Sequence, residues 1–358
     1  MKSYKDKKIL YSLIALGLFA GIGGSLFESA GHIVLPTITI GDIGKTNVSS
    51  ISSASAILAT EQNLETKLPF LPTITLGFVG DIMTTRGVEA KVKKYLGGDY
   101  SKLFDNTAFL KEPDIMFANL EGDVGTTGKD RQNLYSFQMD GATIPAMKDA
   151  GIDVVSFSNN HVLDFGRIAF KETLDRLHKA GIATCGAGLT KTEAEMPAIL
   201  AKDGFNVGFL CFSDVGPYDG AATDTQSGIL LTTDPAFDSI ITNASKKVDA
   251  LIVSFHWGVE YKTIHNARQE EIAKRAIDAG ATMVEGEHPH VVEDISSYNG
   301  VPILYSLGNF IFDQAFSKET MQGAYITATL HGKTVSNVTP HTIVLDKNFV
   351  PSLQPTTK

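Results

Sequence analysis

The sequence predicts an α/β layered fold with mixed sheets, and three observations support this prediction. Short apolar runs typical of buried strands alternate with segments whose apolar residues recur at helical spacing. Five of the apolar runs end at polar residues of types that bind metal ions. Two other segments have the pattern of paired strands, so we expect the sheets to contain antiparallel as well as parallel neighbours.

The predicted elements occupy the chain from Thr73 to about residue 345. Buried strands are expected at residues 74–79, 114–118, 153–157, 250–255 and 281–284. Helices are expected at residues 87–96, 144–150, 167–180, 236–247 and 268–279. The strand pairs are expected within residues 197–212 and 323–345. This alternation of helices with strands is the pattern of an α/β domain.

Polar side chains stand at the ends of the five strands. They are Asp81, Glu121, Asn160, His161, His256, His288 and His290. Because ligands gather at the carboxyl ends of strands in open α/β sheets, we expect these side chains to lie close together. Carboxylate, amide and imidazole groups suit Mn, Fe or Zn and suit Ca poorly. A pair of such ions, about 3.5–4 Å apart, would clamp the attacking and leaving oxygens of an in-line displacement.

The charge of the chain argues against nucleic acid as its main partner. The formal net charge of the chain is −9. Four lysines, Lys2, Lys5, Lys7 and Lys8, lie within the first eight residues, so the rest of the chain is still more acidic. Binding to a phosphate backbone needs a basic surface. An acidic protein that acts on an anionic substrate needs cations, and bound metal ions would supply them.

The two cysteines, Cys185 and Cys211, lie in apolar, strand-like segments. We expect them to be buried free thiols. A disulfide between them is the alternative if the domain lies outside the cytoplasm. They lack the Cys-x-x-Cys spacing of a metal site, so we do not expect them to be metal ligands.

The N-terminus predicts a membrane anchor at residues 1–30. Lys7 and Lys8 precede an uncharged apolar run at residues 9–27. The lysines should stay in the cytoplasm, which places the protein at the cell membrane, single-pass, with its main domain extracytoplasmic. A cleaved signal peptide, with a site near Ser29-Ala30, is the alternative. Residues 31–72 are rich in Ser and Thr and predict a flexible linker.

Six motifs in one order resemble the poly-γ-glutamate capsule biosynthesis (CapA) family. They are Gly80-Asp-Ile-Met, Asn119-Leu-Glu, Asn159-Asn-His-x-x-Asp-x-Gly166, His256-Trp-Gly-x-Glu-Tyr261, Gly286-x-His-Pro-His-Val291 and Tyr305-Ser-Leu-Gly-Asn-Phe-x-Phe-Asp313. The order of the polar residues is also similar to that of the calcineurin-like metallophosphoesterases. The resemblance implies a four-layer α/β/β/α metallophosphatase-like sandwich at residues 73–347, followed by a tail at 348–358. It also implies a role in poly-γ-glutamate capsule synthesis or export.

The resemblance assigns metal-binding roles by position. The first metal would be held by Asp81 and His290, the second by Asn160, His256 and His288, and Glu121 would stand where the superfamily has a bridging Asp. Two positions depart from the pattern. The superfamily opens with Asp-x-His, whereas Met83 stands here, and because a thioether is a poor ligand for a hard ion we expect the first site to be weak or empty. Glu287 replaces a residue that is usually His in the family, and it either adds a ligand or faces solvent.

Three further residues are candidates for the chemistry itself. The resemblance implies that His161 is no metal ligand but protonates the leaving oxygen as a general acid. Asp164 either orients His161 or caps the helix predicted from Arg167. Arg86 either binds an anionic group of the substrate or is a surface residue.

Two functions follow from this pattern. The first is a metal-dependent hydrolase, similar to the metallophosphoesterases, that acts on a phosphoester or a related bond; the intact imidazole set favours it. The second is a non-catalytic subunit that binds an anionic polymer, or is a scaffold for membrane synthetase subunits, with a degenerate metal site. Met83 in the opening motif favours this alternative.

Overall fold

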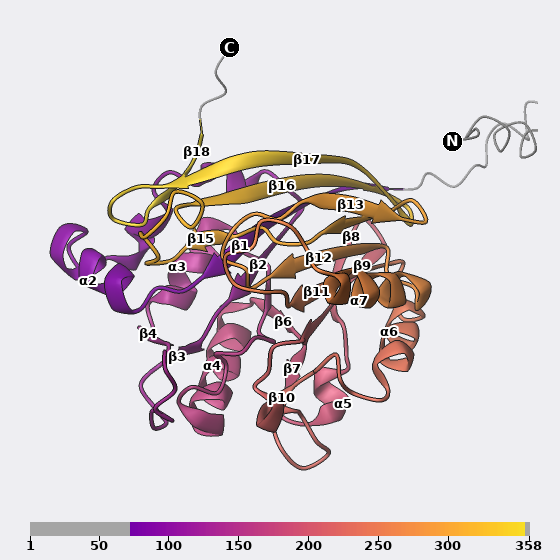
Figure 1. The fold of residues 1–358 in the computed structure, drawn as a ribbon, viewed down its shortest axis with the longest axis horizontal. Helices are drawn as coiled ribbons and strands as arrows, with labels where there is room; N and C mark the ends of the chain where they lie inside the picture. Colours follow the sequence, from indigo (N-terminus) through magenta and orange to yellow (C-terminus); the bar gives the residue numbers. More distant parts are fainter. Residues whose placement is uncertain (1–71, 355–358) are drawn as a thin grey trace, which may run out of the picture. The chain divides into compact units, whose positions relative to one another are not determined.

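The computed structural model describes residues 72–354 of the chain. The predicted anchor at 1–30, the predicted linker up to residue 71 and the last four residues lie outside the described residues. Within residues 72–354, no helix has the length and apolar character needed to cross a membrane. Two large mixed sheets and the helices around them make up the fold of this part of the chain (Figure 1).

The first sheet has the strand order β18-β17-β16-β1-β2-β5-β6, and β15 pairs with β1. Strands β1, β2, β5 and β6 run parallel to one another, whereas β16 is antiparallel to β1, and β17 and β18 continue the sheet through antiparallel pairs. Its strands are β1 (Thr73–Ile82), β2 (Ile115–Leu120), β5 (Val154–Ser156), β6 (Ala183–Cys185), β15 (Asn309–Ile311), β16 (Gln322–His331), β17 (Thr334–Leu345) and β18 (Pro351–Leu353).

The second sheet has the order β13-β14-β12-β11-β9-β8. Its four central strands are parallel, and each edge strand is antiparallel to its neighbour. Its strands are β8 (Ala198–Lys202), β9 (Phe205–Ser213), β11 (Ala250–His256), β12 (Met283–Glu287), β13 (Ile295–Tyr298) and β14 (Val301–Leu304). Two short ladders complete the strands: β3 (Asp123–Val124) with β4 (Gln138–Met139), and β7 (Ala187–Gly188) with β10 (Gly228–Ile229).

The helices are amphipathic segments with identifiable ends. They are α2 (Arg86–Tyr95), α3 (Thr143–Ala150), α4 (Gly166–Ala180), α5 (Lys191–Ala194), α6 (Phe237–Ser245) and α7 (Ala267–Asp278), with 3₁₀ turns η2 (Tyr100–Phe104), η3 (Ala108–Lys111) and η4 (Tyr218–Gly220). A capping box of Asn266 and Gln269 begins α7. Gly181, with φ of 69°, ends α4 in the left-handed conformation that glycine adopts without strain. The five predicted helices and five predicted strands are confirmed, with ends shifted by a few residues.

Three buried cores divide the domain into four layers. Between the two sheets lie alternate residues of facing strands, which are Ile74, Leu76, Phe78, Phe117, Phe209, Ile252 and Met283. Helices α2, α3 and α4 cover the outer face of the first sheet, and helices α6 and α7 cover that of the second. The α/β/β/α arrangement with mixed sheets is therefore confirmed. Each fully buried side chain of this size contributes roughly 1.5–3 kcal/mol to folding.

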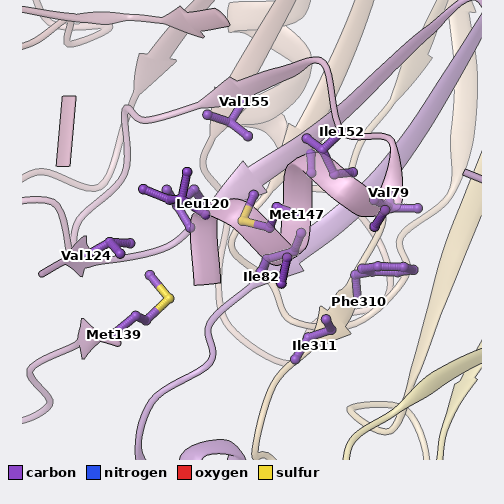
Figure 2. Close-up of a cluster of buried hydrophobic side chains, with 14 of the residues drawn as sticks. Val79, Ile82, Leu120, Val124, Met139, Met147, Ile152, Val155, Phe310 and Ile311 are labelled. Carbon is purple, nitrogen blue, oxygen red and sulfur yellow. The ribbon is translucent and has the colours of Figure 1, made fainter. Parts of the chain in front are cut away.

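The core on the outer face of the first sheet fixes the ends of the strands that approach the candidate site. Figure 2 shows Val79 and Ile82 of β1, Leu120 of β2, Met147 of α3 and Phe310 of β15 as members of one buried cluster. All of these side chains are fully or almost fully buried. Dense packing of this kind leaves little freedom for the residues that follow in the chain.

A β-bulge turns Asp81 toward the space between the sheets. A regular strand places alternate residues on one face, so Phe78 and Asp81 would lie on opposite faces. The register of β1 against β2 shifts after the pair Phe78–Phe117, and the next pair is Asp81–Asn119. The strand β1 thus contains one residue more than β2 over this interval, which reverses the direction of Asp81.

Gly80 makes this bulge possible. A Cβ atom on Gly80 would lie 1.8 Å from the carbonyl oxygen of Gly308. The same carbonyl accepts a hydrogen bond from the backbone N–H of Asp81 at 3.0 Å. The close approach of the two backbones, which only glycine permits, therefore holds Asp81 in place.

The predicted tail at 348–358 does not match the structure over its first residues. Phe349 and Val350 are buried in the outer core of the first sheet, and β18 pairs with β17. The apolar pair Phe349-Val350 explains the difference, since burying it carries the chain back onto the sheet edge. Pro351 suits the edge position, where its missing N–H leaves no ladder bond unmade.

The expectation of free thiols is wrong. Cys185 of β6 and Cys211 of β9 form a disulfide, with their Cα atoms 5.3 Å apart. The bond joins the two sheets, so the sequence alone gave no measure of the distance between these residues. A native disulfide of this kind typically stabilises a domain by about 2–4 kcal/mol.

Candidate metal centre

The carboxyl ends of the parallel strands of both sheets meet at one place, as the sequence predicts. Asp81 at the end of β1, Glu121 after β2 and His256 at the end of β11 each offer one ligand atom, and these atoms all lie within 4.8 Å of one another. All three side chains are buried. Two carboxylates and one imidazole from three strands therefore converge on a site of the size that a metal ion occupies.

Glu121 lies at the middle of the group. Its Oε1 is 3.8 Å from Nε2 of His161 and 3.8 Å from Nε2 of His290. Neither carboxylate oxygen has a hydrogen-bond partner among the described residues. Burial, and then the charge of Asp81, raise the pKa of Glu121 well above its ordinary value.

Asp81 is positioned by polar contacts on both sides. Its Oδ1 accepts a hydrogen bond from Nδ2 of Asn119 at 2.8 Å, and its Oδ2 lies 3.1 Å from Nδ1 of His290. Nδ1 of His290 is also 3.1 Å from Oδ1 of Asn309. A hydrogen bond of this kind to one ring nitrogen fixes the ring and leaves the other nitrogen free to bind a metal.

Asn160, His256 and His288 form the opposite side of the group. Nε2 of His256 lies 2.8 Å from Oδ1 of Asn160, and the rings of His256 and His288 are 4.9 Å apart. Burial and the neighbouring histidines lower the pKa of His256 well below its ordinary value. The same two causes lower the pKa of His288 to about 3. Both rings are therefore neutral at physiological pH, which is the form that binds metal ions.

The turn His288-Pro289-His290 holds its two imidazoles in strained backbone conformations. The φ angles are 102° for His288 and 57° for His290, a region that residues other than glycine rarely adopt. The backbone N–H of Tyr261 donates to the carbonyl of Pro289 at 2.8 Å and supports the turn. Backbone strain of this kind is concentrated at functional sites, where the surrounding structure maintains it.

The balance of charge at this place fits divalent cations. Four carboxylates are buried here, those of Asp81, Glu121, Glu285 and Glu287. The ion pairs that the structure describes for them involve histidines, and no Lys or Arg of residues 72–354 takes part. Buried carboxylates without cationic partners are costly, and a bound divalent ion would offset this cost. The mixed oxygen and nitrogen donors suit Mn, Fe or Zn.

Asp164 orients His161 rather than capping a helix. Its Oδ2 lies 2.7 Å from Nδ1 of His161 and also accepts the backbone N–H of Phe137 at 2.8 Å. Helix α4 begins at Gly166 with Phe165 as its N-cap residue, and no side chain caps it. The capping alternative for Asp164 is therefore wrong. Nε2 of His161 points toward Glu121, and the His161 ring stacks on Phe137 at 3.9 Å.

Arg86 lies apart from the metal-binding side chains. It forms an ion pair with Asp313, and its guanidinium is 4.7 Å from the centre of the Phe137 ring. This half-buried, paired position contradicts the alternative of a free surface residue. Because Phe137 stacks on both Arg86 and His161, the structure connects Arg86 to the site through this ring.

The sequence patterns did not identify every residue of the site. Asn119 donates to Asp81 and was treated only as part of a motif. Glu285 was not considered, although it lies two residues before Glu287 in the same strand and must share its face. Glu287 is 1% exposed, so the alternative that it faces solvent is wrong.

Comparisons with known proteins give a consistent family. A family model described as bacterial capsule synthesis protein PGA_cap matches residues 75–314. The PGA biosynthesis protein CapA of Bacillus subtilis (strain 168) is 34% identical over 248 residues, which cover 68% of this chain and 65% of that protein. The capsule biosynthesis protein CapA of Bacillus anthracis is 31% identical over 340 residues, which cover 89% of this chain and 79% of that protein. The chain therefore spans slightly less than two thirds of the Bacillus subtilis relative.

Among solved structures, the chain is similar to the calcineurin-like phosphoesterase YfkN from Bacillus subtilis. The aligned part covers 79% of this chain and 91% of YfkN. The sequence identity is 13% and the TM-score is 0.46. A likeness at this level carries no statement about activity.

We expect replacement of the converging ligands to remove bound metal. His256→Ala and Asp81→Ala should lose metal to a similar extent, because the geometry places both residues in one group with Glu121. Metal per chain, measured by elemental analysis after exposure to Mn²⁺ and gel filtration, tests this. His265→Ala is the matched control, since His265 is paired with Asp294 and stacked on Tyr305 outside the centre. A much smaller loss from Asp81→Ala would contradict this and would support the weak first site that Met83 predicts.

Proposed function

Because the chain belongs to the bacterial capsule synthesis protein family PGA_cap, we propose that it is a metal-dependent hydrolase of poly-γ-glutamate capsule synthesis or export. Its substrate would contain a phosphoester or a related bond. The observation that carries this proposal is the convergence of Asp81, Glu121 and His256 within 4.8 Å, beside an imidazole that a carboxylate orients. These are the parts that metal-assisted hydrolysis needs.

The residues present would hold one or two divalent ions. Asp81 and His290 would bind on one side, Asn160, His256 and His288 on the other, and Glu121 between them. When bound, the ions would act as Lewis acids that stabilise the negative charge developing on the phosphoryl oxygens. Burial of these side chains lowers the local dielectric constant and so strengthens the electrostatic interactions at the centre, where the attacking water would bind beside the ions.

His161 would supply the proton that the leaving oxygen needs. Asp164 accepts a hydrogen bond from Nδ1, so Nε2 is the nitrogen that faces the centre. The Phe137 ring lies against one face of the imidazole and limits its rotation. A proton donor held in this way is prepared for general acid catalysis before the substrate binds.

The family's process does not by itself identify the bond that is cleaved. The two Bacillus relatives are named for capsule or PGA biosynthesis. Poly-γ-glutamate has amide links and contains no phosphate, so a phosphoester substrate would be an intermediate or a carrier rather than the polymer. The polymer would then be a separate partner of the protein and not the substrate of the hydrolysis.

We place the domain outside the cytoplasm, held at the membrane by the predicted anchor. The disulfide between Cys185 and Cys211 supports this location, because such bonds persist in oxidising compartments. Cell fractionation tests it: the chain should be recovered with the membranes and be digested by protease added outside. Recovery in the cytosol, with both cysteines as thiols, would contradict it.

A groove beside the centre favours a second function, the binding of an anionic polymer. The groove, of about 560 Å³, is lined by Lys129, Asp130 and Arg131, and by Arg167 at the start of α4. The backbone N–H of Arg131 donates to the carbonyl of Asp164, so the groove shares a wall with the segment that orients His161. Arg131 forms an ion pair with Asp219, and Lys129 and Arg167 are the other cations of the groove that would meet the carboxylates of a polyglutamate. Membrane synthetase subunits would be the partners of a scaffold that acts in this way.

His161→Ala tests the enzymatic proposal. The variant should keep its metal and slow turnover of an alkyl phosphoester by about 10²–10⁴-fold, the usual contribution of a positioned general acid. The defect should shrink for an aryl phosphoester, because a good leaving group needs the proton less. His265→Ala, which changes an imidazole outside the centre, should have the activity of the parent.

Two results would count against this account. Loss of metal from His161→Ala would make His161 a ligand rather than an acid. A metal-loaded parent that is inactive on every ester tried would favour the polymer-binding function. In that case, replacement of Lys129 and Arg167 should weaken the retention of polyglutamate.

A further inference from the structure

We propose that Glu287 is a metal ligand of this centre, supplied from the second sheet to the ion that Asp81 binds from the first. This inference rests on the proposed metal centre and adds a residue to it. A ligand must face the ion, whereas a structural glutamate would be held by hydrogen-bond donors between the sheets. Three observations favour a ligand: the register of β12, the place of the carboxylate near β1, and its lack of hydrogen-bond partners.

The register of the second sheet places Glu287 on the face of the centre. Glu287 is the last residue of β12, and it pairs with His256 of the parallel strand β11. Paired residues of neighbouring strands project from the same face of a sheet. Because His256 projects toward Asp81 and Glu121, Glu287 must project into the same space.

The carboxylate of Glu287 reaches the bulge that carries Asp81. A Cβ atom on Gly80 would lie 3.3 Å from Oε2 of Glu287. The carboxylate therefore lies close to β1 at the residue immediately before Asp81, on the opposite side of the space between the sheets. A side chain at residue 80 would crowd this carboxylate, whereas glycine leaves room for it near enough to Asp81 for the two charges to repel each other.

No Lys, Arg, amide or backbone N–H group of residues 72–354 donates to the Glu287 carboxylate, and the group beside it is another carboxyl, that of Glu285. The side chain is 1% exposed, and neither of its carboxylate oxygens has a partner among the described residues. Glu293, also buried, shows how this fold satisfies a structural glutamate: its Oε2 accepts a hydrogen bond from Nε2 of Gln269 at 2.6 Å. A buried carboxylate that lacks such a donor and lies beside Asp81 is suited to a cation.

The residues that follow Asp81 in the chain provide no good second ligand for an ion bound there. Two residues later, Met83 is fully buried and packs with Phe137 and Phe312 in a small apolar cluster. A thioether in that cluster is a poor ligand for a hard divalent ion. Glu287 therefore completes the coordination on this side with a carboxylate from the facing sheet, next to His290.

The test compares metal affinities of the full-length chain by calorimetric titration with Mn²⁺. Glu287→Gln keeps the shape of the side chain and removes its charge, so binding should weaken by at least about tenfold, as loss of groups around metal sites commonly does. Glu287→Asp keeps the charge on a shorter side chain and should bind more tightly than Glu287→Gln. Glu293→Gln is the matched control of a buried glutamate with its own donor, and its affinity should equal that of the parent.

Stability without metal separates a ligand from a structural residue. The metal-free Glu287→Gln variant should unfold at the same temperature as the metal-free parent or higher, while its stabilisation by Mn²⁺ should be smaller. Metal affinity equal to the parent, or a lower unfolding temperature of the metal-free variant with its Mn²⁺-induced shift unchanged, would overturn the inference. A parent that binds no metal would instead contradict the proposed function.

Discussion

Four carboxylates buried between two sheets are the constraint on which the centre depends. Asp81, Glu121, Glu285 and Glu287 are buried, and the described ion pairs of this group involve only imidazoles. In the absence of cations, burial and mutual repulsion raise the pKa of Glu121 and Glu287 well above the ordinary value. Divalent ions bound to the folded state would offset this cost, and metal binding would then be linked to folding stability.

The architecture concentrates these charges through simple geometric rules. Alternation along β11 and β12 brings His256 and Glu287 to the same face, and the parallel order brings their strand ends to the same edge. The bulge at Gly80 then reverses Asp81 toward them, and positive φ angles at His288 and His290 return two imidazoles to the group. Local strain and a costly charge cluster thus occur together where function is concentrated.

The sequence predicted those features that follow from periodicity and strand order. The buried strands, the helices and the convergence of residues such as Asp81 and His256 needed only alternation and the rule that ligands gather at strand ends. Contacts between distant segments could not be derived in this way. The disulfide joins two sheets, and Phe137 reaches His161 from a loop. Asp164 contacts His161, while Phe165 rather than Asp164 is the N-cap residue of α4. The side of the sheet to which the Glu287 side chain points depends on the register of β12 against β11, and this register cannot be read from the sequence alone.

The most direct test of a metal centre between the sheets is anomalous diffraction at the zinc edge from crystals grown with Zn²⁺. We predict an anomalous peak among Asp81, Glu121 and His256, the three residues whose ligand atoms already converge. Its distances to the ligand atoms should be about 2.0–2.2 Å, as in other zinc sites with oxygen and nitrogen ligands. Ordered side chains at this place with no anomalous peak, from crystals that contain Zn²⁺, would contradict the account.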